Sequence, residues 1–312
     1  MSSTSGKLAV ETAPTIPMEN SGIANFLTFD IEDWFHILDL HERQSTPAEW
    51  HSFPSRLESN IDRILELLSE RGVYATFFVL GWVAEKYPSV VKKLDSLGHE
   101  IACHGYGHDL ITGLTREQLK DDIHRARVIL EDLTGKAIGG YRGPGFSITM
   151  KNLWAFDVIA EEGFAYDATL YPGLHGHGGI PRLPADPFRL RTLDGHLLEE
   201  FPVTIIGVGK HRLAFSGGGY FRLVPFPVMT ALIKRFNRRG RQVMMYIHPR
   251  DIDAETPRLP MPLKRRFKCY VNLSGSHEKL RKILARHAFS SISVWRNDHG
   301  SNSWPTISLK DL

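Results

Sequence analysis

The chain has 312 residues, 42% of them hydrophobic and 23% charged, which is enough to bury the core of one large domain or two smaller ones. This composition excludes a mostly disordered, collagen-like or low-complexity protein. The formal net charge of +3, with all 15 histidines counted as neutral, argues against a generic nucleic-acid-binding protein.

The N-terminus and the cysteines bear on the protein's location. Residues 1–22 are rich in Ser, Thr, Pro and Glu and lack the apolar core of a signal peptide, which predicts a flexible leader outside the fold. No segment approaches the ~18 consecutive apolar residues that a membrane span needs. The two cysteines, Cys103 and Cys269, are too few for a disulfide scaffold. We therefore expect a cytoplasmic protein by default.

Amphipathic helices alternate with short apolar segments along the chain, and most of these helices end at a glycine. Strands are expected at 25–29, 73–80, 99–103, in a stretch ending at Tyr141, at 164–166 and at 242–247. Helices are expected at 57–68, 90–97, 115–133, 153–162 and 228–239. This alternation predicts a parallel sheet covered by helices, in either a (β/α) barrel or an open doubly wound sheet.

Five ionisable residues come at or directly after the ends of predicted strands. They are Asp30, His104, Arg142, Asp167 and His248. Parallel α/β folds build their sites at this edge, where the carboxyl ends of the strands meet. We therefore expect a functional site there rather than a chance placement.

The segment His104-Gly-Tyr-Gly-His108 places two imidazoles at a spacing suited to one metal ion. Two surface histidines are the simpler interpretation of such a pair. The acidic cluster Asp30-Ile-Glu32-Asp33 at another strand end favours the metal site, because two histidines and one carboxylate bind Zn²⁺ and leave a position for water. A second carboxylate would then act as general base, and a distant histidine as general acid. These groups together predict hydrolysis of an amide or ester.

The motifs that carry these residues resemble, in their order, those of the polysaccharide deacetylase superfamily (carbohydrate esterase family four). They span residues 28–36, 104–108, 141–146, 166–171 and 245–248, and the fourth is the weakest match. The stretch 248–253 and a late helix at 277–287 resemble a subgroup associated with exopolysaccharide and O-antigen synthesis.

The resemblance implies a distorted (β/α)₇ barrel and a metal-dependent N-deacetylase that uses zinc or another divalent cation. Asp30 would be the general base, oriented by Arg142, and His248 the general acid, while His104 and His108 would bind the metal. The catalytic domain would span residues 23–290, followed by a polar tail at 291–312 that either caps the domain or frays.

The first motif departs from the usual pair of adjacent aspartates, because Ile31 follows Asp30. The carboxylate ligand must then be Glu32 or Asp33. Strand alternation would place Glu32 on the same face as Asp30, which slightly favours it. Both remain candidates at this point.

Substrate contacts are expected from residues beside these motifs. The candidates are Trp34, Tyr106, Gly143, Phe146, Asp167 and Tyr171, although aromatic residues beside a site are as often core packing.

A backbone N–H within 141–146 is expected to hold the oxyanion. The glycine-rich segment 217–221 is either a substrate loop or, in the simpler interpretation, a plain connection. The basic runs 234–241 and 264–268 are solvated faces or contacts for acidic glycans or anionic lipids.

The leading functional hypothesis is removal of N-acetyl groups from an amino sugar in a bacterial surface polysaccharide or its precursor. Its partners would be an N-acetylated carbohydrate and, through peripheral association, the membrane-bound machinery of glycan synthesis; no nucleic acid is expected. One alternative is a zinc amide hydrolase that acts on a small cyclic amide or ureide. Another is a glycan-binding pseudoenzyme that has lost its metal.

Overall fold

The structure is a computed structural model, and it describes residues 23–38, 47–209 and 211–312. The predicted leader at 1–22 lies outside these residues. Within the described ranges, no helix combines the length and the apolar character needed to cross a membrane.

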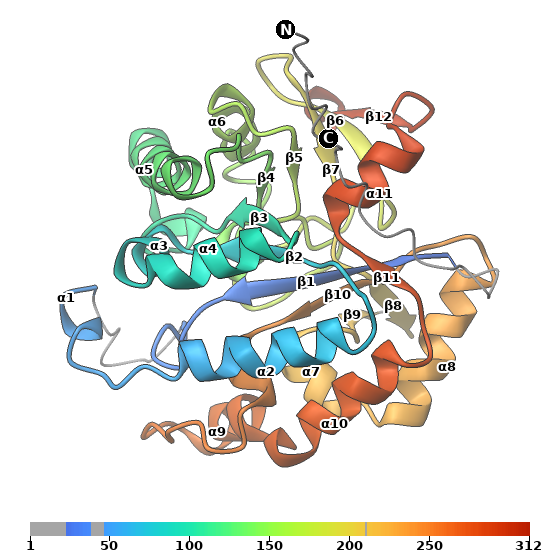
Figure 1. Cartoon of the computed structure of the whole chain (residues 1–312). Coiled ribbons are helices and arrows are strands. Elements are labelled where there is room, and N and C mark those ends of the chain that lie inside the picture. The colour runs from blue at the N-terminus through green and yellow to red at the C-terminus, as the bar shows by residue number, and fades with distance from the viewer. Residues whose placement is uncertain (1–22, 39–46, 210) are drawn as a thin grey trace, which may run out of the picture.

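A large, mostly parallel sheet forms the centre of the fold (Figure 1). Seven of the described strands follow one another in parallel, in the order β10-β1-β2-β3-β4-β5-β7. Their bounds are β1 Asn25–Ile31, β2 Thr76–Val79, β3 Glu100–Cys103, β4 Gly140–Tyr141, β5 Tyr166–Asp167, β7 Leu197–Glu200 and β10 Met244–Ile247. The shortness of β4 and β5, at two residues each, reduces the pairing in this part of the sheet.

The two ends of this seven-strand path approach each other through the chain that follows β7. Met244 of β10 receives a hydrogen bond at its carbonyl from the Ser216 hydroxyl, and its N–H donates to the Thr204 hydroxyl. Gly217 also forms an isolated parallel bridge with Tyr246. The sheet therefore curls as in a distorted barrel, although no continuous ladder between described strands closes it. The predicted α/β fold with a parallel sheet is confirmed.

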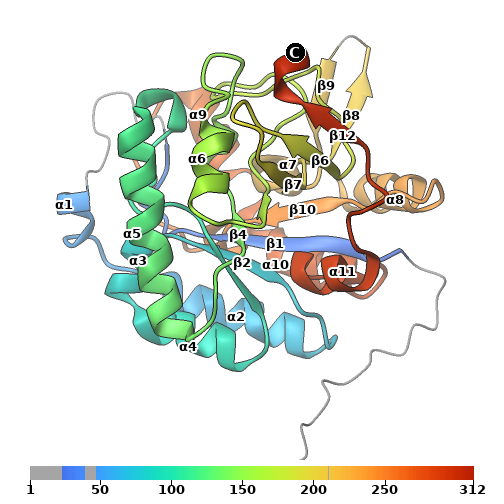
Figure 2. The ribbon, with the colours of Figure 1, turned by 90° about the horizontal axis from the view of Figure 1, so that it is seen from above.

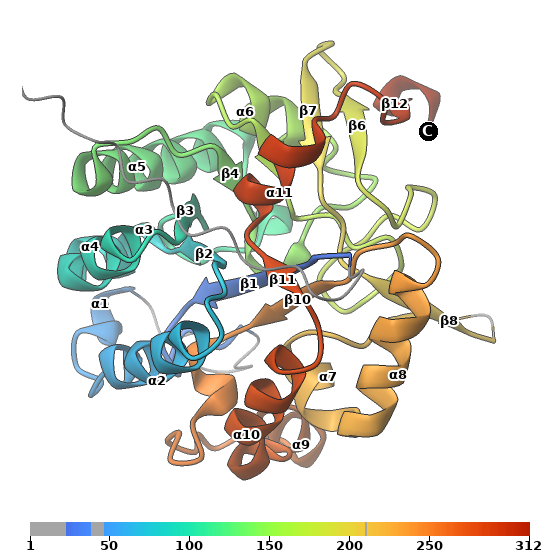
Figure 3. The ribbon, with the colours of Figure 1, turned by 45° about the vertical axis from the view of Figure 1, so that its right-hand side comes forward.

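Helices surround the strands (Figures 1–3). The described helices are α1 Pro47–Trp50, α2 Leu57–Ser69, α3 Gly81–Lys86, α4 Pro88–Ser96, α5 Arg116–Thr134, α6 Ala155–Glu161, α7 Gly218–Leu223, α8 Phe226–Asn237, α9 Leu263–Tyr270, α10 Leu273–Leu284 and α11 Ile292–His299. Helix α5 begins with the predicted capping box, in which Thr115 and Gln118 each bond the other's backbone N–H. It ends at Gly135, which adopts the left-handed conformation that glycine tolerates best.

Residues 291–312 are folded onto the sheet. Strand β11 (Phe289–Ser290) pairs with β1, and in α11 the Trp295 ring packs against Phe26 and Phe201. Strand β12 (Thr306–Ser308) adds to β6 (Phe188–Arg191), which itself pairs antiparallel with β7. This segment therefore extends the sheet and caps the domain, so of the two expectations for the tail, capping describes it and fraying does not.

Buried His99, directly before β3, makes the stability of the fold sensitive to acid. It is 8% exposed, and burial lowers its pKa to about 4 from the value near 6.5 expected in the unfolded chain. The unfolded state therefore binds the proton first as the pH falls, so this contribution to stability is complete above pH 6.5 and is lost toward pH 4.

We predict that His99→Gln will reduce the loss of unfolding free energy between pH 6.5 and 5.0 by about 1–2 kcal/mol relative to the unsubstituted protein. Urea unfolding at the two pH values measures this. Other buried histidines also contribute to the loss of unfolding free energy at low pH. The comparison is therefore between the loss in the variant and the loss in the unsubstituted protein. An equal loss in both would contradict the assignment to His99.

Candidate active site

Four of the five ionisable residues predicted at strand ends meet at one site, and three of them, Asp30, His104 and His248, line its cleft. Asp30 is the sixth residue of β1, and His104, Arg142 and His248 directly follow β3, β4 and β10. These strands are neighbours in the sheet, which is why residues more than 200 positions apart in the sequence come together. The fifth residue, Asp167, ends β5 but is buried away from the cleft.

A buried ion pair joins Asp30 to Arg142. The Nη1 group of Arg142 lies 2.6 Å from Asp30 Oδ1 and also donates to the Thr28 hydroxyl at 2.8 Å. Its Nε donates to the carbonyl of Ala168, and its guanidinium stacks over the Phe78 ring. Arg142 is fully buried, so these contacts fix it and thereby hold one oxygen of Asp30 in place.

Glu32, His104 and His108 form a buried cluster whose potential ligand atoms all lie within 4.8 Å of one another. Glu32 Oε1 is 2.9 Å from His108 Nε2 and 3.3 Å from His104 Nε2. This set of two imidazoles and one carboxylate fits a divalent ion such as zinc. The Nδ1–H of His104 donates to the Arg142 carbonyl at 2.7 Å, so the neutral ring keeps its Nε2 lone pair toward the cluster.

The loop that carries the two histidines is held by Asp122 of α5. The Asp122 carboxylate accepts hydrogen bonds from the backbone N–H groups of Tyr106 and Gly107, both at 2.8 Å. Gly105 has a φ of +74°, and a Cβ at this position would lie 2.6 Å from an oxygen of Asp122. The loop therefore needs glycine at position 105 both for its conformation and for this close approach.

Glu32 is the first-motif carboxylate in the cluster, and its charged form is stabilised there. Burial alone would raise its pKa, but the charges of His108 and His248 and the hydrogen bond from His108 hold the pKa well below its usual range. The ionised carboxylate is the form that binds a cation.

Asp33 does not belong to this cluster, which corrects its inclusion among the ligand candidates. Its carboxylate accepts hydrogen bonds from the Ser55 hydroxyl and from the N–H groups of Trp34 and Arg56. Glu32 and Asp33 therefore have separate tasks. Asp33 anchors the first-motif loop to the start of α2.

Paired substitutions separate these two tasks. We predict that Glu32→Gln will weaken zinc binding by at least about 100-fold, because it replaces a charged ligand by a neutral one. Asp33→Asn should leave zinc affinity within a few-fold and lower the unfolding free energy by about 1 kcal/mol through the weakened anchor. Titration against a fluorescent zinc chelator and urea unfolding measure the two effects. The reverse pattern would identify Asp33 as the ligand.

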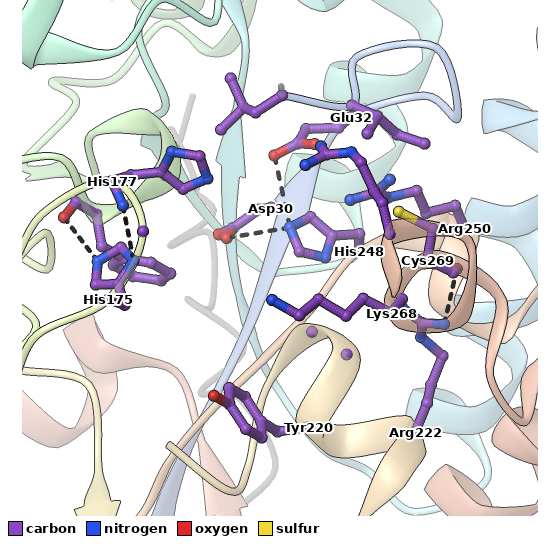
Figure 4. Close-up of a pocket in the computed structure, with 18 of the residues that line it drawn as sticks. Asp30, Glu32, His175, His177, Tyr220, Arg222, His248, Arg250, Lys268 and Cys269 are labelled. Atoms are coloured by element: carbon purple, nitrogen blue, oxygen red, sulfur yellow. Dashed lines mark hydrogen bonds and ion pairs between the residues drawn. The ribbon is translucent and has the colours of Figure 1, made fainter. Parts of the chain in front are cut away.

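His248 faces both parts of the site from β10. Its Nε2 lies 3.6 Å from Glu32 Oε1 and 3.9 Å from Asp30 Oδ2, and Figure 4 shows the ring pointing toward both carboxylates. Its Nδ1 lies 2.9 Å from Asp251 Oδ2. Burial alone would lower the pKa of His248, but the charges of Glu32 and Asp251 and the bond to Asp251 raise it, which favours the protonated ring.

The sequence reasoning missed the two residues that support His248. Asp251 accepts a hydrogen bond from the His248 backbone N–H, and its other oxygen accepts from Arg222 Nε at 2.9 Å. Arg222 in turn donates to the backbone carbonyls of Lys268 and Cys269. The spacing of three residues between His248 and Asp251 was the available signal for the first contact; nothing local indicated the second.

The cleft has a volume of about 830 Å³ and opens beside these groups (Figure 4). Of the predicted substrate residues, Gly143 and Phe146 line it. Gly218, Gly219 and Tyr220 of the glycine-rich segment also line it, at the start of α7, so this segment is a wall of the cleft rather than a plain connection. His175 and His177 face the cleft as well.

Three of the predicted aromatic contacts, Trp34, Tyr106 and Tyr171, are not among the residues that line the cleft. Trp34 is 5% exposed and donates to the Pro54 carbonyl. Tyr171 is also buried, and its hydroxyl accepts from the Ala214 N–H. The Tyr106 hydroxyl donates to Glu85, and Arg125 covers the Tyr106 ring. The packing alternative therefore describes these side chains.

Asp167 does not line the cleft, so the structure does not place it at the predicted substrate contact. It supports the backbone of the site instead. It is fully buried beside Glu200, and burial raises the pKa of both carboxyl groups. It accepts from the Thr169 hydroxyl, whose oxygen accepts from the Gly143 N–H at 2.7 Å. This relay fixes the backbone of the third motif.

The site thus brings a cluster that could hold a metal ion, a buried carboxylate–arginine pair and a histidine together at one edge of the sheet. We compared the chain with known families and structures. Residues 26–157 match the polysaccharide deacetylase family model, and residues 168–296 match a domain of unknown function (DUF3473). The first match covers 132 of the 312 residues and shows similarity to polysaccharide deacetylases over that part of the chain. The matches do not identify the exopolysaccharide subgroup.

Curated relatives are similar over part of the chain. A peptidoglycan deacetylase of Helicobacter pylori is 33% identical over 118 residues, which are 36% of this chain and 38% of that protein. A peptidoglycan-N-acetylglucosamine deacetylase of Bacillus cereus is 36% identical over 94 residues, 30% of this chain and 34% of that protein. The chain therefore spans about a third of the length of these relatives.

Solved structures share the fold over nearly the whole chain. A polysaccharide deacetylase candidate from Mycobacterium smegmatis aligns with a TM-score of 0.60 at 22% identity and covers 94% of both chains. The PuuE allantoinase aligns with a TM-score of 0.57 at 17% identity, covering 92% of this chain and 95% of that one. These alignments extend the fold assignment beyond the stretch matched in sequence.

Proposed function

We propose that this protein is a metal-dependent hydrolase that removes N-acetyl groups from an amino sugar in a bacterial surface polysaccharide or its precursor. One observation carries the proposal. The Glu32–His104–His108 cluster, the Asp30–Arg142 pair and His248 converge on the same cleft, so ligands, a base and an acid are within reach of one bound group. The named activities of the curated relatives support deacetylation.

Glu32, His104 and His108 would hold the ion. Bound there, zinc would act as a Lewis acid toward the acetamide carbonyl and lower the pKa of a coordinated water toward about 7. Asp30 would act as the general base that accepts a proton from water, because one of its oxygens is fixed by Arg142 and the other faces the cleft. His248 then donates a proton to the departing amine, which the pair with Asp251 favours.

The backbone of the third motif provides the remaining group for the oxyanion. Among its residues that line the cleft, the Gly143 N–H is engaged by Thr169, and the Phe146 N–H donates to the Gly143 carbonyl. Pro144, which lies between them, has no N–H to donate. By elimination, we assign the oxyanion donor to the N–H of Gly145, another cleft residue.

The size of the cleft favours a sugar chain over a small ring. A volume of about 830 Å³ lies toward the upper end of the range for ligand pockets, ~300–1,000 Å³, and is more than a cyclic amide or ureide needs. A pseudoenzyme is disfavoured because the cluster, the base and the acid are all present.

The test compares two substrate classes on zinc-loaded protein. We expect acetate release from N-acetylated chitotetraose and no turnover of allantoin or dihydrouracil. Turnover of a cyclic compound without acetate release would favour the small-molecule amide hydrolase. Binding of chitotetraose without turnover of any substrate would favour the pseudoenzyme, and either result would overturn the proposal.

A further inference from the structure

One side of the cleft mouth has an unusual concentration of exposed apolar side chains. Eleven large hydrophobic residues are exposed among those the structure describes, and four of them line this cleft. Leu263 and Phe267 of α9 are 82% and 56% exposed, and Leu223 and Tyr220 of α7 are 45% and 37% exposed. Apolar side chains gathered at one place on a surface indicate an interaction site.

The same side of the molecule is basic. From Thr256 to His277 the sequence contains five lysines and arginines and no aspartate or glutamate. Lys264 and Lys268 follow Leu263 and Phe267 directly, so each pair recurs at helical spacing along α9. Both lysines are exposed and line the cleft mouth, and neither forms an ion pair with a described residue.

We call Leu223, Leu263, Lys264, Phe267 and Lys268 the α9 surface. Its chemistry distinguishes between occupants. A neutral glycan stacks on aromatic rings and gains little from exposed leucines, whereas acyl chains accept leucine and phenylalanine. Anionic headgroups supply the negative charge that Lys264 and Lys268 lack within the protein. Apolar side chains interleaved with lysines on a short helix are typical of interfacial membrane binding.

We propose that the α9 surface docks the protein onto an anionic lipid bilayer, with the mouth of the cleft beside the headgroups. Leu263 and Phe267 insert at the boundary between headgroups and acyl chains, and Lys264 and Lys268 contact lipid phosphates. This docking does not depend on the hydrolytic activity. Combined with the proposed function, it implies that the cleft acts on glycans presented at a membrane.

Vesicle sedimentation with the full-length protein tests the proposal. The probes are vesicles of phosphatidylcholine alone and of phosphatidylcholine with phosphatidylglycerol. Lys264→Gln with Lys268→Gln should weaken partitioning to the anionic vesicles by about 20-fold. Leu263→Ser with Phe267→Ser should weaken it by about tenfold or more. The matched control is Arg235→Gln on α8 with Arg238→Gln directly after it, which removes the same charge from exposed positions elsewhere and should change partitioning less than threefold.

Three results would overturn the proposal. The first is that the unsubstituted protein does not bind anionic vesicles. The second is that the α8 control loses as much binding as the lysine variant. The third is that both α9 variants bind as well as the unsubstituted protein. A competition experiment tests whether the α9 surface binds an acidic glycan instead of lipid. If a hyaluronan tetrasaccharide binds through Lys264 and Lys268 and displaces the vesicles, the α9 surface binds an acidic glycan and the membrane proposal is wrong. Because the readout is binding, failure here leaves the deacetylase proposal untouched.

Discussion

Replacing His104 by alanine should abolish both zinc binding and acetate release. The substitution removes one of three ligands, and it also removes the hydrogen bond by which this ring is held to the Arg142 carbonyl. We expect zinc affinity to fall by about 100-fold or more and activity to fall below detection. Metal content of the purified variant and acetate release from chitotetraose measure the two effects.

The matched control is His196→Ala, which removes an exposed histidine far from the cluster in sequence and should leave both quantities unchanged. Circular dichroism shows whether each variant is folded. Full retention of either zinc or activity in the His104 variant would show that the cluster is not the functional metal site.

Replacing Asp30 by asparagine should lower the rate of hydrolysis and leave zinc binding intact. The amide oxygen of the new side chain would still accept a hydrogen bond from Arg142, but it would not take up a proton, so kcat should fall by about 10²–10⁴-fold. Zinc binding should remain within a few-fold, because Asp30 is not among the three clustered ligands. The loss of a buried ion pair will also lower stability, so kcat is measured on protein shown to be folded.

Asp62→Asn is the control for this substitution, since it removes a surface carboxylate paired with Lys93 and should not change kcat. Activity within tenfold of the unsubstituted protein would rule out Asp30 as the general base. Loss of zinc from the Asp30 variant would instead place this carboxylate in the metal site.

The sequence predicted the fold and the edge of the sheet where the site lies, because both depend on local patterns. Alternating helices and apolar strands dictate a parallel sheet, and the carboxyl ends of its strands bring Asp30, His104, Arg142 and His248 together. The choice between Glu32 and Asp33 needed coordinates, because beyond the end of β1 at Ile31 strand alternation no longer determines where side chains point.

Contacts between distant segments account for the failures. Trp34, Tyr106 and Tyr171 lie beside the motifs in sequence, but their hydroxyl and indole groups have partners in other segments that turn them away from the cleft. Asp122 and Arg222 support the site from helices that lie outside the five motifs. Their roles come from tertiary packing, for which a single sequence has no local signal.

The polar C-terminal segment shows the same limit for the fold. Its composition suggested a tail, yet Trp295 is 7% exposed against Phe26, and β12 pairs with β6. A segment of polar average composition still folds onto the domain when a few of its residues are apolar and can pack against an apolar face, and when its backbone can pair with a sheet edge.

The most direct test of the central claim is removal and return of the metal. Protein stripped with dipicolinate should release no acetate from chitotetraose, and one equivalent of zinc per chain should restore the activity. The Glu32→Gln variant, treated identically, should require far more zinc for the same recovery. Undiminished acetate release by protein shown to contain no metal would contradict a metal-dependent site built on Glu32, His104 and His108.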